Sequence, residues 1–182
     1  MRIHRLGLLI FTMAALADEP RLPRPDEVDK PGNIQFIVLD KTKLPGVVVD
    51  NTEAKLVGKW KHSVHTPPFV GVSYIHDLKE KKGEKSATFT PNLPHAGVYE
   101  VRVSHNSNIR RANGVPITIR HAHGMTTVKI NEGKPAPIKM LFRSLGKFTF
   151  HKGRAGSVTI GTTGTEGKYV IVDAVQFIPL KK

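Results

Sequence analysis

Alternation of apolar and polar residues recurs in short runs along this chain, and no segment shows the 3.6-residue period of a helix. In GVYEVRV (residues 97–103), Tyr99, Val101 and Val103 alternate with polar residues. A period of two places the apolar side chains on one face of an extended strand. That face must be covered by a second layer, so the pattern favours two packed sheets.

Turn-forming Gly, Pro and Asn residues separate these runs at short intervals. Most of the runs present one apolar face each, as packed antiparallel sheets require. The sequence therefore predicts an all-β fold, an antiparallel β-sandwich or jelly roll. The predicted strands are residues 34–39, 46–50, 54–60, 86–91, 97–103, 115–121, 126–131, 145–150, 156–160 and 168–180.

The N-terminal residues differ in composition from the predicted sandwich. Residues 1–17 join a positive start, an apolar run and an A-x-A site, which together predict a secretory signal peptide. A buried N-terminal helix or strand is the alternative. The run is too short to cross a membrane. Residues 18–45 are predicted to be a Pro- and charge-rich linker and lead-in, and residues 46–182 the sandwich module, secreted or periplasmic.

The chain has no cysteine, which excludes a disulfide scaffold, a thiolate metal site and a cysteine nucleophile. Its formal net charge is +13, and removal of residues 1–17 would leave +11 because Arg2 and Arg5 are lost. Such a charge favours anionic partners, acidic polysaccharide among them. A generic basic surface is the alternative, since the cations are scattered. No nucleic-acid-binding motif is present.

The last predicted strand is apolar on both faces, which places it in the middle of a sheet. Alternation puts Asp173 on the same face as Val175 and Phe177. A buried carboxylate needs a partner, because burying it alone costs several kcal/mol. Arg111 is the first candidate, since a guanidinium pairs with a carboxylate bidentately. Backbone N–H groups are the alternative.

Five stretches of the sequence, taken in order, resemble one known family. They are DNTEAKLVGKWKHS (50–63), FVGVSYIHD (69–77), KGEKSATFTPNLPHAGVYEVRV (82–103), RRANGVPITIRHAHGMTTVKIN (110–131) and GTEGKYVIVDAVQFIP (164–179). They are similar to the golvesin-like, or xanthan-lyase C-terminal-like, carbohydrate-binding-type domain. The resemblance implies a galactose-binding-like jelly roll, of a kind appended to secreted lyases and FAD-dependent oxidoreductases. It also suggests a structural calcium ion, for which Asp50, Asn51 and Asp173 offer hard oxygen ligands; no other cofactor is expected.

Catalytic patterns are weak in this sequence. The histidine pairs His62/His65 and His121/His123 could chelate a metal, but spacing identifies no further ligands, and exposed turn histidines are the alternative. There is no G-x-S-x-G elbow and no dinucleotide-binding GxGxxG motif. A lyase arrangement of Tyr74, His76 and Arg111 remains as an enzymatic alternative.

The segment GVSYIHD is the best candidate for a ligand site. Sugar binding needs an aromatic platform together with polar groups for the hydroxyls. The candidate glycan-binding residues are Trp60, Phe69, Tyr74, His76, Asp77 and Arg111. The alternative is that Trp60 and Tyr74 belong to the core and that His76 and Asp77 form a structural polar pair.

Taken together, these patterns predict a non-catalytic secreted module that binds polysaccharide or a cell-surface glycan, accessory to an enzyme or to the envelope. Two alternatives belong to other classes. One is a structural module that docks to a partner enzyme or envelope protein. The other is the detached C-terminal domain of a polysaccharide lyase or an FAD-dependent oxidoreductase. No nucleic-acid partner and no membrane span are expected.

Overall fold

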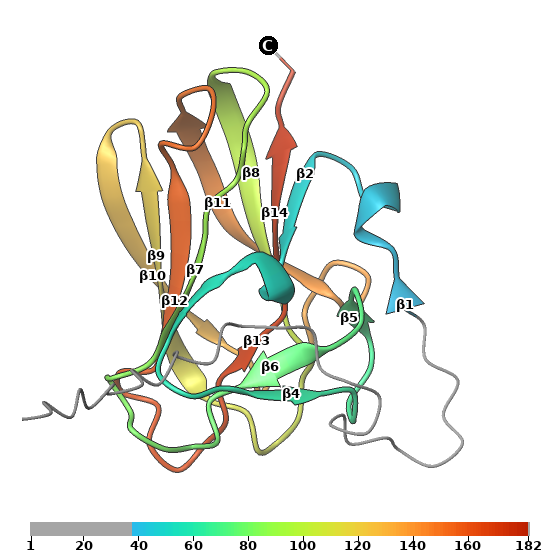
Figure 1. Cartoon of the computed structure of the whole chain (residues 1–182), viewed down its shortest axis with the longest axis vertical. Helices are drawn as coiled ribbons and strands as arrows, with labels where there is room; N and C mark the ends of the chain where they lie inside the picture. Colours follow the sequence, from blue (N-terminus) through green and yellow to red (C-terminus); the bar gives the residue numbers. More distant parts are fainter. Residues whose placement is uncertain (1–37, 182) are drawn as a thin grey trace, which may run out of the picture.

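Two antiparallel sheets lie face to face in the computed structural model, which describes residues 38–181 (Figure 1). The five-stranded sheet has the order β10 (Gly124–Asn131), β9 (Asn113–His121), β12 (Ser157–Gly161), β7 (Ser86–Phe89) and β3 (Lys55–Val57). The four-stranded sheet has the order β11 (Phe142–Phe150), β8 (Gly97–Ser104), β14 (Ala174–Pro179) and β2 (Val47–Asp50). The predicted β-sandwich is confirmed.

The main core fills the space between these two sheets. Ile117 and Ile119 of β9 face it from one side, and Val101 of β8 and Phe177 of β14 from the other, all fully buried. The Phe150 ring contacts the Phe177 ring edge-on, with 5.6 Å between centroids. Each such side chain contributes about 1.5–3 kcal/mol through burial. The alternation predicted from sequence therefore builds the core.

A third, smaller sheet and a two-stranded pair close one end of the sandwich (Figure 1). The sheet comprises β13 (Ile171–Val172), β6 (Tyr74–His76) and β4 (Lys61–Ser63), and the parallel pair comprises β1 (Val38–Leu39) and β5 (Phe69–Val70). Two 3₁₀ turns, η1 (Lys41–Lys43) and η2 (Asn51–Glu53), flank β2. Strands of two or three residues are too short to show alternation, so the sequence did not predict β4, β5 or β6. The segment around His62, which lies outside the predicted strands, forms β4.

The predicted strand 168–180 divides into two. β13 pairs with β6, whereas β14 pairs with β2 and β8, so the chain passes from one sheet to another at Asp173. β14 lies in the middle of its sheet, as predicted. At this bend the Asp173 carboxylate accepts a hydrogen bond from Ser104 of β8. Ser104 directly follows the core-facing Val103, so its side chain lies on the opposite face of the sheet. The prediction that Asp173 shares the face of Val175 and Phe177 was wrong, because alternation does not continue across a bend.

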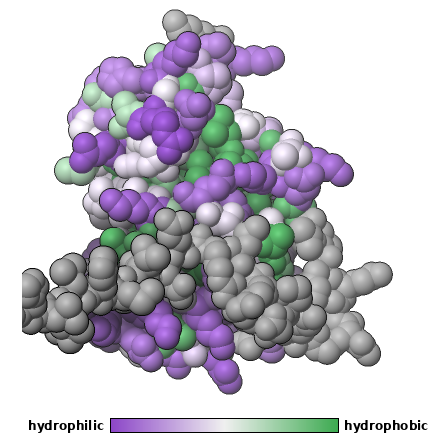
Figure 2. Space-filling view, viewed as in Figure 1, coloured by the Kyte–Doolittle hydropathy of each residue, from purple (hydrophilic) through white to green (hydrophobic). Residues whose placement is uncertain are grey.

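Two small apolar clusters lie outside the main core. One contains Val64, Phe69, Tyr74 and Ile171; the other contains Val70, Leu141, Phe142 and Ala174. The second cluster covers part of the outer face of the four-stranded sheet, the face that carries Gln176. On the side shown in Figure 2, hydrophilic residues dominate the described surface, with a strip of hydrophobic residues between them.

The predicted signal peptide (1–17) and most of the predicted linker (18–45) lie outside the described residues. The described part of the linker includes β1, whose Leu39 packs against the second apolar cluster. Among the described residues, no helix is long and apolar enough to span a membrane.

Candidate functional site

The predicted glycan-binding segment, residues 69–77, forms β5 and β6 at the closed end of the sandwich. Phe69 and Tyr74 are 1% and 2% exposed, and their ring centroids lie 5.8 Å apart. The Tyr74 hydroxyl accepts a hydrogen bond from Ser63 Oγ at 3.1 Å. Both rings therefore belong to a small core, which was the alternative for Tyr74, and neither forms an exposed platform for a sugar.

Trp60 lies apart from these rings. Its side chain is half-buried and packs against the main core. Its indole Nε1 donates a hydrogen bond to the Val57 carbonyl at 3.0 Å, which satisfies the one polar atom of the ring. Trp60 thus contacts the core, as the alternative interpretation held.

Asp77 is fully buried at the end of β6, where it fixes the following loop. Its Oδ1 accepts hydrogen bonds from the backbone N–H groups of Lys79 at 3.1 Å and Val170 at 3.0 Å. Its Oδ2 pairs with the Lys82 ammonium group. Leu78 and Lys79 have φ angles of +61° and +60°, an uncommon conformation that these bonds help to hold. Asp77 is a structural residue that positions Lys79.

Four side chains meet beside this loop: His76, Lys79, Arg111 and Tyr169, hereafter the Tyr169 cluster. The Tyr169 ring is half-buried, and its centroid lies 5.0 Å from that of His76. Lys79 Nζ lies 4.6 Å from the Tyr169 ring centroid, and the Arg111 guanidinium carbon lies 5.8 Å from it. A partly exposed aromatic ring is therefore flanked by two cations and an imidazole.

Arg111 is held in place by hydrogen bonds. Its Nε and Nη2 donate to Asn106 Oδ1 at 3.1 and 2.9 Å, and Nη2 donates to Thr66 Oγ1 at 3.2 Å. Its guanidinium carbon also lies 6.0 Å from the Tyr74 ring centroid. All these partners are neutral, so the charge of Arg111 is not cancelled by them. The predicted pairing of Arg111 with Asp173 was wrong, since Asp173 bonds to other groups.

The His76 ring is oriented by the backbone. Its Nδ1 lies 3.2 Å from the Leu78 N–H, which can only donate. Nδ1 is therefore the acceptor, and neutral His76 carries its proton on Nε2. His76 and Arg111 are thus the two residues of the predicted glycan-binding set that are partly exposed beside Tyr169.

Sequence reasoning did not select Tyr169 or Lys79. Tyr169 falls within the predicted strand 168–180, and Lys79 lies outside all of the predicted strands. Arg111 and Tyr169 form a parallel β-bridge although they lie far apart in the sequence. No local pattern marks such a pair, so only the fold shows that these side chains meet.

Asp50, Asn51 and Asp173, the predicted calcium ligands, are all buried. Asp50 caps η2, and its Oδ1 accepts from Thr52 N at 3.1 Å and Thr52 Oγ1 at 2.7 Å. Asp173 accepts from the Val70 N–H at 3.2 and 3.1 Å and from the Ser104 hydroxyl. Backbone capping of Asp173, the alternative to Arg111, is what the structure shows.

Three buried polar atoms at this site have no hydrogen-bond partner among the described residues: Asp50 Oδ2, Asn51 Oδ1 and Asn51 Nδ2. Burial raises the pKa of Asp50, and burial together with the nearby Asp50 raises the pKa of Asp173 well above its usual range. Two neighbouring buried carboxyl groups need a proton or a cation between them. The donors are hard oxygens, which suits calcium, so a calcium ion here stays a prediction.

The histidine pairs do not gather into a larger group. His62 Nδ1 lies 3.0 Å from Ser73 Oγ, and the rings of His121 and His123 are 6.2 Å apart at the hairpin between β9 and β10. Within residues 38–181, no group of three or more His, Cys, Asp or Glu side chains is placed to hold a metal ion.

Comparison with known proteins gives consistent matches over the sandwich. Residues 47–179 match the model of the Golvesin C-terminal domain. The xanthan lyase of Bacillus sp. (strain GL1) is 37% identical over 141 residues, which is 75% of this chain. The structure of a Paenibacillus xanthan lyase superposes with a TM-score of 0.70 and 33% identity over 74% of this chain.

These relatives are much longer proteins. The matched region is 15% of the Bacillus enzyme and 13% of the Paenibacillus chain. A Podospora anserina GH26-CBM35 β-(1,4)-mannanase shares the fold, with a TM-score of 0.56 at 15% identity over 75% of this chain and 28% of that one. The sandwich thus recurs as one part of larger enzymes.

Proposed function

Because the chain belongs to the Golvesin C-terminal domain family, we propose that it is a non-catalytic module that binds polysaccharide through the Tyr169 cluster. The observation that carries this proposal is a half-buried tyrosine ring flanked by Lys79 and Arg111 at the closed end of the sandwich. Aromatic rings pack against the C–H faces of sugars, and cations bind acidic substituents.

Among polysaccharides, the positive net charge of the protein favours acidic ones as ligands. The net charge is +13, and the exposed Lys79 lies on the Tyr169 ring. A uronate packed against Tyr169 brings its carboxylate within reach of both Lys79 and Arg111. A neutral sugar gains no such contact, so acidic chains bind more tightly and their binding falls with salt.

The relatives suggest which polymer to test first. Two proteins named xanthan lyase contain a region similar to this chain at 37% and 33% identity. Xanthan is therefore the first ligand to test, beside other acidic and neutral polysaccharides. The signal-like residues 1–17 fit a protein exported to where such polymers occur.

Binding to immobilised polysaccharides at low and high salt tests the proposal. We expect binding to an acidic polymer that weakens at high salt, and about ten-fold weaker binding in Tyr169→Ala and in Lys79→Ala. Lys55→Ala is the matched control, because Lys55 is also exposed but lies on β3 of the five-stranded sheet. Unchanged affinity in both cluster variants, with unchanged Tm, would remove the Tyr169 cluster from the proposal.

The non-catalytic part needs a separate measurement. The chain is incubated with each bound polymer, and the products are assayed for new reducing ends and for unsaturated uronate absorbance. We expect neither signal to exceed that of the polymer alone. A signal that grows with protein concentration would instead favour the lyase or hydrolase alternative.

A further inference from the structure

A buried acid, Glu132, joins the two chain segments that carry the ring and the guanidinium group of the Tyr169 cluster. Its carboxyl group accepts a hydrogen bond from the Ile171 N–H at 2.8 Å, and its own N–H donates to the Ala112 carbonyl at 2.9 Å. Ile171 lies two residues after Tyr169, and Ala112 directly follows Arg111. The Ala112 N–H also donates to the Tyr169 carbonyl at 2.8 Å. Glu132, which is only 1% exposed, is therefore part of the buried support of the proposed glycan site.

Glu132 lacks the cationic partner that a buried acid normally has. It forms no salt bridge with any residue in the described part of the chain, whereas Asp77 pairs with the Lys82 ammonium group. A buried carboxylate without a paired cation is costly, so the neutral acid is favoured over a wider range of pH. Burial raises the pKa of Glu132 to about 8. Its charge therefore changes just above neutral pH.

Three charged side chains act on Glu132 from the loops packed beside it. Arg111 and Lys82 favour its ionised form, and Asp77 opposes that form. Arg111 lies beside the ring of the Tyr169 cluster, and the pair of Asp77 and Lys82 supports the loop that carries Lys79. The charge of Glu132 is thus coupled to the groups that bind an anion in the proposed function.

The other titratable side chains on these neighbouring segments bond elsewhere. His76 accepts a hydrogen bond from a backbone N–H, and Lys85 donates one to the Asp77 carbonyl at 2.6 Å. Asp173, whose pKa is also raised, accepts from the Ser104 hydroxyl. The charges that act on Glu132 are therefore those of the cluster and of its support.

Ionisation of Glu132 opposes the binding of an anion at the cluster. The hydrogen-bond partners of Arg111 are neutral, so an ionised Glu132 offsets a charge that those partners leave intact. It also repels a carboxylate that binds beside the Tyr169 ring. By the same interaction, a bound carboxylate favours the neutral form of Glu132. Binding of the anion and binding of the proton therefore support each other to the same extent.

We propose that Glu132 makes binding at the Tyr169 cluster proton-linked: acidic saccharides bind tightly while Glu132 is protonated and are released as it ionises. The linkage rests on the proposed function, because it concerns the same site, and adds regulation of that site by pH. Where free Glu132 is partly ionised, formation of the complex takes up part of a proton from the solvent. A neutral saccharide brings no charge to the site, so its affinity does not depend on Glu132.

Calorimetric titration with acidic xanthan oligosaccharides between about pH 7 and pH 9 tests the linkage, because lysine, arginine and sugar carboxyl groups keep their charges in this range. The same oligosaccharides with methyl-esterified carboxyl groups are the neutral probe. We expect the affinity for the acidic form to fall about five-fold as pH rises, with no such fall for the ester. Proton uptake appears as a binding enthalpy that depends on the ionisation enthalpy of the buffer.

A matched pair of variants assigns the effect to Glu132. Glu132→Gln keeps an acceptor for the Ile171 N–H but does not ionise, so its affinity for the acidic probe is expected to be constant over this range. Glu166→Gln removes the same charge at an exposed loop position and should retain the fall. Carbonyl-carbon NMR of the parent is independent of any variant. The titration midpoint of the Glu132 carboxyl group should rise when the acidic probe saturates the protein.

The outcomes separate the linkage from the proposed function. Binding of the acidic probe that is equal at both ends of the range would refute the linkage alone. The same conclusion follows if Glu132→Gln shows the fall of the parent, if the ester shows it too, or if the Glu132 midpoint does not move. Absence of binding at every pH, for these and other acidic polysaccharides, would overturn the proposed function and the linkage with it.

Discussion

At the residue scale, Asp173 shows how burial and bonding combine. Its carboxyl group is fully buried, yet it accepts hydrogen bonds from the Val70 N–H and the Ser104 hydroxyl. Burial and the neighbouring Asp50 raise its pKa, which favours the neutral acid. Asp173 therefore ties together β5, β8 and the bend between β13 and β14.

Substitutions of Asp173 distinguish two roles of its carboxyl group, hydrogen bonding alone and calcium binding. Asp173→Ala leaves two buried donors unpaired and should lower the free energy of unfolding by about 3 kcal/mol. Asp173→Asn keeps an acceptor for Val70 N–H and should cost less. Denaturant titration gives both values. If calcium is bound, a chelator lowers the Tm of the parent, and the two variants lose similar stability because each loses the metal.

Glu132 is a second buried acid, and its titration predicts how stability depends on pH. Its carboxylate accepts from the Ile171 N–H at 2.8 Å, and burial raises its pKa to about 8 despite the nearby Arg111. Between its ordinary value of 4.5 and about 8, the folded protein holds a proton that the unfolded chain releases. Stability therefore falls as pH rises through this window.

Thermal unfolding of the parent and of Glu132→Gln between about pH 6.5 and pH 8 tests this effect. Asp173, whose pKa is also raised, adds a fall of the same sign to both proteins. Burial lowers the pKa of His105 from its ordinary value of 6.5 to about 4. His105 therefore affects the pH dependence of stability only below about pH 6.5, outside this window. We expect the Tm of the parent to fall across the higher window and the fall to be smaller in Glu132→Gln. Glu166→Gln, at an exposed loop position, is the matched control. An equal fall in Glu132→Gln and the parent would show that Glu132 titrates normally.

At the scale of elements, the turn into β2 is constrained by β14. Gly46 has a φ of +78°, and a Cβ added to it would lie 2.2 Å from the Phe177 carbonyl oxygen. β2 pairs with β14 from Val47 onward, so this close approach belongs to the sheet itself. Glycine is required here for two reasons, the left-handed conformation and the neighbouring backbone.

A pair of glycine substitutions separates these two reasons. Gly164 has a similar φ of +73°, but a Cβ there would meet nothing within 4 Å. We expect Gly164→Ala to cost about 1 kcal/mol through its backbone conformation alone. Gly46→Ala should cost about 3 kcal/mol or more, because the clash is added. Urea denaturation measures both, and equal losses would mean that β2 moves aside at little cost.

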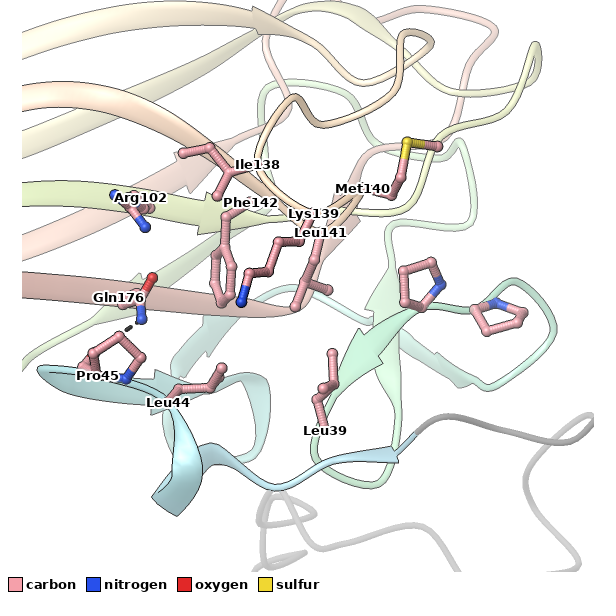
Figure 3. A pocket seen from close by; sticks show the side chains of 12 residues that line it. Leu39, Leu44, Pro45, Arg102, Ile138, Lys139, Met140, Leu141, Phe142 and Gln176 are labelled. Atoms are coloured by element: carbon pink, nitrogen blue, oxygen red, sulfur yellow. Dashed lines mark hydrogen bonds between the residues drawn. The ribbon is translucent and has the colours of Figure 1, made fainter.

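At the scale of the whole molecule, burial between two sheets stabilises a chain that has no cysteine. The small clusters at the closed end extend that burial and carry the Tyr169 ring, while the second cluster borders an apolar pocket. The proposed glycan site therefore lies on the additional layer rather than on the sandwich core. The loop between β4 and β5 links this site to the apolar pocket on the outer face of the four-stranded sheet (Figure 3), since its Thr66 bonds to Arg111 and its Pro67 lines the pocket.

Export of the whole chain is predicted by its first residues. Cleavage after Ala17 would leave a mature protein that begins at Asp18 with a net charge of +11, since Arg2 and Arg5 are removed. N-terminal sequencing of protein recovered outside the producing cells checks this. Material that still begins at Met1 would contradict the signal-peptide interpretation.

The sequence by itself determined the fold class, the long strands and the burial of Asp173. Residues such as Val101, Ile117 and Ile119 alternate with polar neighbours, and alternation is a local property that needs no knowledge of the fold. It also identified Arg111 and the segment around His76 as candidate site residues. The family resemblance, drawn from ordered stretches along the chain, is likewise confirmed.

Only the tertiary structure decided which residues meet. The strands β4, β5 and β6 depend on partners far along the chain, because two or three residues cannot specify a strand by themselves. Because the chain bends at Asp173, the Asp173 carboxyl group bonds to Ser104 and Val70. Arg111 lies beside Tyr169 instead. Such contacts arise where separate layers pack, so alternation within one strand does not reveal them.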